Sequence, residues 1–209
     1  MAREALTEAT LARAAQTLAS RDPDLALILQ RLGPPPLWAR PPGFPTLVKI
    51  ILEQQVSLAS ASSLFSKLQK HTVPFRPARV IELGESHLKS LGLTRQKTAY
   101  CLDLAECLRD RRLRLARLPY MADDEVKAAL MEVKGIGAWS AEVYLLMVLR
   151  RPDVWPAGDL ALARAAFKVK RLKQHPTPEA LTKLAEPWRP FRSVAARMLW
   201  QHYLARDEK

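Results

Sequence analysis

The chain has 209 residues and a formal net charge of +12, because 33 residues are Lys or Arg and only 21 are Asp or Glu. A chain of this length can bury one sizeable core or two smaller ones. The excess of positive charge favours a polyanionic partner, nucleic acid above all; the alternative is that the surplus cations only solvate the outer faces of helices.

Cysteine and apolar content exclude several other classes of protein. The two cysteines, Cys101 and Cys107, lie six positions apart in a helical pattern, so they form neither a disulfide framework nor a metal-binding pair. No run of about 18 apolar residues is present, and the first residues lack the apolar region of a signal peptide. We therefore expect a cytoplasmic protein that does not associate with membranes.

The spacing of apolar residues is helical along most of the chain, and no segment alternates as a strand would. The sequence therefore predicts an all-α fold. In chain order, helices are predicted at residues 6–18, at 25–32, from Thr46, at 58–68, at 97–108, at 125–131 with Asp123 as N-cap, at 138–149, from Leu160, at 179–185, and from Pro190 to about Tyr203.

Two proline-rich connections, GPPPLWARPPGF at 33–44 and RRPDVWPAGD at 150–159, divide this series of helices. Residues 46–151 are expected to form a central helical subdomain, with a helix-hairpin-helix at about 123–150. Residues 1–45 and 152–209 are expected to form a second helical subdomain together. We expect the protein to be a monomer.

A pair of glycines, Gly135 and Gly137, precedes a helix that is apolar on most faces. Glycine allows backbone angles that a side chain would forbid, and it leaves the amides of the turn uncovered at a helix N-terminus, where a phosphate can bind. Lys134 and Ser140 beside the turn suit a phosphate of the DNA backbone. The alternative is a tight interhelical turn that binds nothing.

The segment LMEVKGIGAWSAEVYLL resembles the helix-hairpin-helix of the base-excision DNA glycosylase superfamily, in which a Gly/Pro-rich loop and a catalytic aspartate follow the hairpin. Here the loop is VWPAGD, and PAGDLALARAA is similar to the aspartate segment of the 3-methyladenine DNA glycosylase II branch. FPTLVKIILEQQVSLASASSLFSKL, GLTRQKTAYCLDLAE and WRPFRSVAARMLWQHYL extend the resemblance over most of residues 44–203. It implies an active-site cleft between the two helical subdomains.

The resemblance also implies a function: a monofunctional DNA glycosylase that flips alkylated bases, of the 3-methyladenine or 7-methylguanine type, out of double-stranded DNA and excises them in base excision repair. Asp159 would stabilise the positive charge that builds on the sugar. Its other interpretation is an N-cap for the helix from Leu160, and the two are compatible. The rival function is a non-catalytic helix-hairpin-helix DNA-binding module, which has no use for a carboxylate beside anionic DNA.

Relatives with lyase activity have a lysine at the position of Trp139, and the iron-sulfur cluster of some relatives needs four cysteines. We therefore expect no lyase activity, no iron-sulfur cluster and no required cofactor. The resemblance places Trp139, Trp200 and Phe44 around the flipped base, where aromatic rings would stack on it. The alternative for each is an ordinary core aromatic.

Further contacts with DNA are implied for polar side chains of the central subdomain. Gln54 and Gln55 lie where the family inserts a side chain into the gap that the flipped base leaves, and Thr94 would contact the opposite strand. The family hairpin often binds a monovalent cation through main-chain carbonyls, which here would be those of Met131, Val133 and Ile136.

Overall fold

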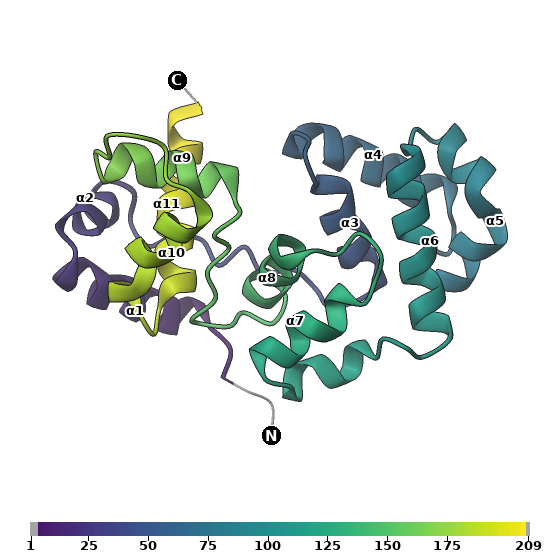
Figure 1. Cartoon of the computed structure of the whole chain (residues 1–209), viewed down its shortest axis with the longest axis horizontal. Helices are drawn as coiled ribbons and strands as arrows, with labels where there is room; N and C mark the ends of the chain where they lie inside the picture. The colour runs from purple at the N-terminus through teal and green to yellow at the C-terminus, as the bar shows by residue number, and fades with distance from the viewer. Residues whose placement is uncertain (1–3, 208–209) are drawn as a thin grey trace. The chain divides into compact units, whose positions relative to one another are not determined.

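The structure, a computed structural model, describes residues 4–207, and all regular secondary structure in this range is helical (Figure 1). The prediction of an all-α fold is therefore confirmed. By its internal contacts the chain divides into two compact units, and the boundary between them falls within α8 (Ala138–Met147). No helix in the described part of the chain is long and apolar enough to cross a membrane.

The first unit, which we call the hairpin unit, comprises Arg40–Tyr144 together with Met1–Arg3, which lie outside the described residues. Its helices are α3 (Phe44–Glu53), α4 (Leu58–His71), α5 (Pro77–Ser90), α6 (Arg95–Arg109), the 3-10 helix η1 (Leu115–Tyr120), α7 (Asp123–Met131) and the first part of α8. α3 is buried over most of its length because it packs against both α4 and α6. This central position explains why its sequence is apolar on nearly every face.

Side-chain caps set the starts of several helices in this unit. The hydroxyls of Ser57 and Thr94 accept hydrogen bonds from backbone amides in the first turns of α4 and α6. At α7 the prediction was wrong by one residue, since the N-cap is Ala122 and Asp123 is the first helical residue. The extended backbone of Ala122 suits a cap, and the carboxylate of Glu125 accepts its amide hydrogen at 2.7 Å.

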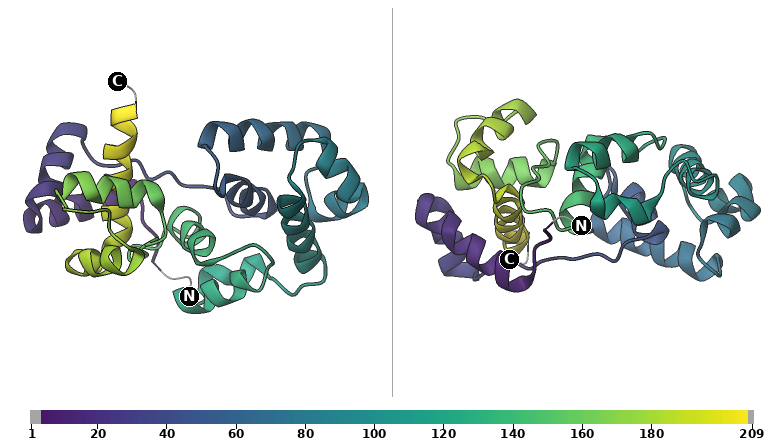
Figure 2. Two further views of the ribbon diagram at one scale, coloured as in Figure 1. Left: turned by 45° about the horizontal axis from the view of Figure 1, so that its top comes forward. Right: turned by 90° about the horizontal axis from the view of Figure 1, so that it is seen from below.

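The second unit, which we call the aspartate unit, comprises Glu4–Ala39 and Leu145–Lys209. Its helices are α1 (Glu8–Arg21), α2 (Pro23–Leu32), α9 (Leu160–Val169), α10 (Pro178–Ala185), the 3-10 helix η2 (Glu186–Trp188) and α11 (Arg192–Asp207). α11 is the central helix, and α1, α2 and α9 pack against it (Figures 1 and 2). The two ends of the chain therefore build one core together.

A buried arginine joins three segments of the aspartate unit. The guanidinium of Arg197 donates hydrogen bonds to the carbonyl oxygens of Leu37 at 3.0 Å, Ser193 at 3.1 Å and Leu146 at 2.6 Å. Burial lowers the pKa of Arg197 to about 10, so the group is still charged at neutral pH. Its bonds tie the proline-rich linker and the end of α8 to α11.

A second polar contact centres on Asp22, the N-cap of α2. Its carboxylate accepts hydrogen bonds from Nζ of Lys170 at 2.6 and 2.7 Å and from Nε1 of Trp188 at 2.8 Å. Burial acts to raise the pKa of Asp22, but the hydrogen bonds and the charge of Lys170 outweigh it and hold the pKa below its ordinary value. The carboxylate therefore links α2 to the end of α9 and to η2.

We predict that Asp22→Asn lowers the free energy of unfolding at neutral pH by about 2 kcal/mol, because Lys170 loses a partly buried partner. A carboxyl whose folded-state pKa is lowered stabilises the protein above its unfolded pKa, and this stability is lost as the pH falls through the folded value. The difference between wild type and variant in denaturant titrations should therefore shrink as the pH falls through the lowered pKa of Asp22. A difference that stays constant with pH would contradict this account, and Asp124→Asn, at an exposed position, is the control.

Candidate active site

The turn between α7 and α8 requires glycine at only one of its two glycine positions. Gly135 has φ of +84°, and a Cβ there would collide with the ring of Tyr100. Gly137 has no positive φ, and a Cβ there would meet nothing within 4 Å. The prediction that both glycines provide unusual backbone angles is thus wrong for Gly137, whose missing side chain leaves open space at the N-terminus of α8.

Two amides of the turn are hydrogen-bonded within the described part of the chain, and two are not. The amide of Lys134 donates to Oδ2 of Asp103 at 2.7 Å, and the amide of Ile136 donates to the carbonyl of Val133 at 3.0 Å. Within residues 4–207 the amides of Gly135 and Gly137 have no acceptor. Uncovered amides at a helix N-terminus form a site for an anion, and the exposed side chain of Lys134 adds a positive charge beside them.

Gln54 and Ser140 hold the turn from inside. Nε2 of Gln54, at the end of α3, donates to the carbonyl of Gly135 at 2.8 Å and to Oγ of Ser140 at 2.9 Å. Ser140 is 3% exposed, so its hydroxyl faces the interior and not an approaching phosphate, which differs from the expectation. A hydrogen-bonded brace of this kind rigidifies the turn, because each buried polar group has its partner.

Gln55 is the exposed member of the glutamine pair. Its φ of +56° lies in the left-handed region that residues other than glycine rarely adopt. Gln54 is partly buried and occupied by the brace, whereas Gln55 is exposed, so the insertion of a glutamine side chain into DNA stays a prediction for this pair. Thr94 is also exposed, but its hydroxyl already caps α6.

The helices of the hairpin are joined by an ion pair of 2.8 Å between Lys127 on α7 and Glu142 on α8. Burial raises the pKa of Glu142, although Lys127 acts in the opposite direction. No cluster of three or more His, Cys, Asp or Glu in the described residues could hold a metal ion. The carbonyl of Val133 accepts one hydrogen bond and keeps a second lone pair, so the main-chain cation site at Met131, Val133 and Ile136 stays a prediction.

The aromatic residues of the hairpin unit occupy two environments. Phe44 is 5% exposed, and its ring lies 5.4 Å from that of Phe75, which in turn packs against Phe65. Phe44 is therefore a core aromatic, and the prediction that it lines a base pocket finds no support in its surroundings. Trp139 is partly exposed in the first turn of α8, beside the uncovered amides.

In the aspartate unit, Asp159 is the N-cap of α9, as the sequence predicted. Its Oδ1 accepts two hydrogen bonds, from the amide of Leu162 at 2.7 Å and from Nε1 of Trp200 at 3.1 Å. The residue is partly exposed. The start of α9 therefore holds a carboxylate in a defined orientation at the surface, and the helix dipole favours negative charge there.

Trp200 is 8% exposed, and its ring meets the edge of Trp38 with centroids 6.5 Å apart. Trp38, in the proline-rich linker, has φ of +46°, so a left-handed linker residue is packed against the tryptophan that contacts Asp159. Sequence patterns give no signal for this contact or for Asp103 and Tyr100 under the hairpin, because the partners are distant along the chain.

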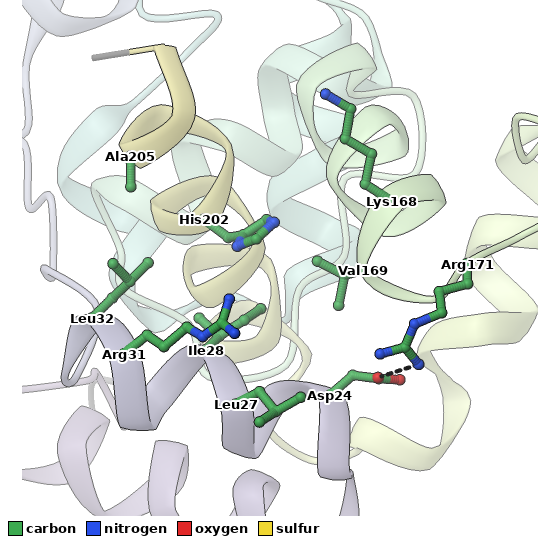
Figure 3. A pocket seen from close by; sticks show the side chains of 10 residues that line it. All are labelled: Asp24, Leu27, Ile28, Arg31, Leu32, Lys168, Val169, Arg171, His202 and Ala205. Carbon is green, nitrogen blue, oxygen red and sulfur yellow. Dashed lines mark ion pairs between the residues drawn. The ribbon is translucent and has the colours of Figure 1, made fainter. Parts of the chain in front are cut away.

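A surface hollow between α2, α9 and α11 lies at the far end of α9 from Asp159 (Figure 3). Arg31 and His202 point toward it, Lys168 is among the residues that line it, and Arg171 pairs with Asp24 across 3.5 Å. Cations in the last turns of α2 and α9 complement the negative ends of those helices. These charges are thus explained by the fold, and the hollow is separate from the aspartate site.

The all-helical fold and the hairpin define a class of DNA-repair proteins. A family model described as HhH-GPD superfamily base excision DNA repair protein matches residues 48–190, which include both the hairpin and Asp159. The chain belongs to this superfamily, and the resemblance found in the sequence is confirmed.

Individual proteins agree with this family. The chain is 29% identical over 164 residues to the protein YfjP of Bacillus subtilis, covering 74% of this chain and 57% of that protein. It is 27% identical over 197 residues to the alkylbase DNA glycosidase-like protein mag2 of Schizosaccharomyces pombe, covering 90% and 92%. Among solved structures, the 3-methyladenine DNA glycosylase Mag1 of the same yeast, in complex with abasic DNA, shares the fold with a TM-score of 0.78 and 23% identity, covering 90% and 95%.

We predict that Gly137→Ala impairs DNA binding and that Gly135→Ala impairs folding stability. Gly137→Ala should leave thermal stability unchanged or slightly higher, but lower the affinity for damaged and undamaged duplex about fivefold, since a methyl group obstructs a phosphate at the turn. Gly135→Ala should lower the free energy of unfolding by about 2 kcal/mol or more, because of its φ and Tyr100. Melting curves and fluorescence anisotropy measure the two effects, and wild-type affinity in Gly137→Ala would refute phosphate binding there.

Proposed function

We propose that the protein is a monofunctional DNA glycosylase that excises alkylated purines from double-stranded DNA, with Asp159 as the catalytic residue. The observation that carries this proposal is the carboxylate at the start of α9, which is partly exposed and held by two hydrogen bonds. It rests also on membership of a base excision repair superfamily whose match includes that residue.

The chemistry follows from the charge that develops during the reaction. Cleavage of an N-glycosidic bond builds positive charge on the sugar, so a fixed carboxylate close to the anomeric carbon stabilises the transition state more than the ground state. The same carboxylate can orient the attacking water or accept its proton. A carboxylate already held in orientation, as Asp159 is by Leu162 and Trp200, needs little reorganisation during this step.

Alkylated purines are the substrates that this arrangement favours. A purine alkylated at N3 or N7 carries a positive charge, so its glycosidic bond is already weakened and the leaving base needs no proton from a general acid. A partly exposed tryptophan such as Trp139 can hold a cationic ring by stacking, with about 0.5–2 kcal/mol of attraction beyond ordinary contact. The name of the relative mag2, an alkylbase DNA glycosidase-like protein, supports the same substrate class.

A tryptophan at position 139 also supports hydrolysis without lyase activity. The indole side chain has no amine that could form a Schiff base with the sugar. The chain has two cysteines, too few for a cluster that needs four, and both are buried; burial raises the pKa of Cys101 to about 12, which leaves it an unreactive thiol. We therefore propose no resident redox cofactor.

We predict that Asp159→Asn lowers the single-turnover rate of base release by about a hundredfold or more, because asparagine keeps the cap but removes the charge. Affinity for the damaged duplex should change by less than about threefold. The rate is measured on a 7-methylguanine duplex by alkaline cleavage at abasic sites, with Glu179→Gln, an exposed carboxylate in the first turn of α10, as the control.

Two results would contradict the proposal. A near wild-type rate in Asp159→Asn would remove the catalytic role from that residue. A covalent enzyme–DNA adduct trapped by borohydride on the intact damaged duplex would assign the protein to the lyase branch.

We further predict that Trp200 acts as a positioning residue for Asp159. Trp200→Phe keeps an aromatic ring but removes the Nε1 donor, so base release should slow about tenfold while DNA affinity stays within about threefold. Trp188→Phe is a matched control, because it removes the same kind of bond to Asp22 and should lower the melting temperature only. Slower release in Trp188→Phe, or an unchanged rate in Trp200→Phe, would show that the bond to Asp159 has no special effect.

A further inference from the structure

A dense run of arginines connects α6 to α7. The segment from Arg109 to Arg117, RDRRLRLAR, carries five arginines in nine residues. Leu113 and Leu118 anchor it, with exposed fractions of 4% and 1%. The side chains of Arg111, Arg112, Arg114 and Arg117 are exposed and line one groove with Tyr120. We call this the arginine groove.

Among residues 4–207, the groove carries more positive charge than its acidic neighbours pair with. Arg109 forms two hydrogen bonds with Asp110, at 2.7 and 3.1 Å. The carboxylate of Glu125, which also lines the groove, accepts the amide hydrogen of Ala122. The four groove arginines form no ion pair within 4 Å in the described part of the chain, although α7 begins with three acidic residues. Their guanidinium groups are therefore available to an external anion.

The backbone at Arg111 makes arginine an unfavourable residue for the fold at this position. Its φ of +57° is left-handed, directly after the C-cap of α6. Glycine is the usual residue at such a position, because any side chain makes this conformation less favourable. An arginine there adds positive charge beside the groove at the expense of local stability, as Arg171 does after the C-cap of α9.

We propose that the arginine groove binds phosphates of the duplex that flanks the excised base. Guanidinium groups match phosphate geometry and stay charged at every physiological pH. The groove lies at the start of α7 and the hairpin at its end, and nine helical residues span about 13 Å, which corresponds to about four base-pair steps along a strand. One duplex can therefore reach both. This inference rests on the proposed function for the identity of the partner.

The salt dependence of DNA binding tests the proposal. Each phosphate contact contributes about 0.9 to the slope of log affinity against log salt concentration. Loss of two contacts in the double variant Arg114→Gln, Arg117→Gln should reduce that slope by about 2. Between about 50 and 200 mM salt, wild type should then lose about tenfold more affinity than the double variant.

A matched control removes the same charge elsewhere. Lys173→Gln with Lys183→Gln replaces two exposed lysines of the aspartate unit and should keep the wild-type slope. Equal slopes in the arginine variant and wild type would overturn the proposal and leave an acidic protein as the partner of the groove. A slope reduced equally by both double variants would also overturn it, because it would report net charge alone.

Arg111→Gly separates binding from folding. Glycine relieves the left-handed backbone, so the melting temperature should be equal or higher while the affinity for duplex falls. A destabilised variant, or one with wild-type affinity, would contradict the inference. All slopes are measured on undamaged duplex, so they remain informative if no base release occurs. If base release occurs but the slopes do not change, only the arginine groove is wrong.

Discussion

Oδ1 of Asp159 accepts hydrogen bonds from α9 and from Trp200 on α11, and the catalytic role that we propose for Asp159 depends on this contact. A carboxylate that stabilises positive charge must keep its own charge and its orientation in the presence of anionic DNA. The start of α9 contributes an amide and a favourable dipole, and the indole contributes a second donor without adding a cation that would neutralise the charge. Trp38 and the buried bonds of Arg197 hold the linker beside α11, so the support of the carboxylate extends into the core.

In the hairpin unit, hydrogen bonds from side chains likewise hold a candidate binding site in place, and that site consists of backbone amides. Gln54 and Asp103 occupy some of the polar groups of the turn and leave the amides of Gly135 and Gly137 uncovered. Gly135 is needed by the fold, because its backbone angle and Tyr100 exclude a side chain, whereas a Cβ at Gly137 would meet nothing within 4 Å in the described part of the chain. The distinction separates a glycine that builds the turn from one that leaves space for a ligand.

Much of the architecture follows from local patterns. Apolar periodicity predicted the all-α fold, and the starts of α9 and α10 fell at or next to the predicted residues because Asp159 and proline at 178 are strong local signals. The cap at Ala122 was missed because alanine has no side-chain acceptor. The hydrogen bond there runs from the amide of Ala122 to the carboxylate of Glu125, three residues later. α5 was also not predicted as one long helix, since non-helical backbone at Gly84, where φ is +70°, interrupts it.

The sequence by itself determined the helical class, the superfamily and the glycine turn, and it singled out Asp159, because each follows from local patterns of neighbouring residues. Only the tertiary structure decided which polar residues are braces and which are exposed: Gln54 and Ser140 face inward, Gln55 faces outward, and Phe44 lies in a core. The hydrogen bond from Trp200 to Asp159 was also decided by the tertiary structure alone, since the two residues are 41 positions apart. Whether a side chain is buried or paired depends on which helices pack against it. A buried glutamine and an exposed one look the same in the sequence, so local patterns cannot tell them apart.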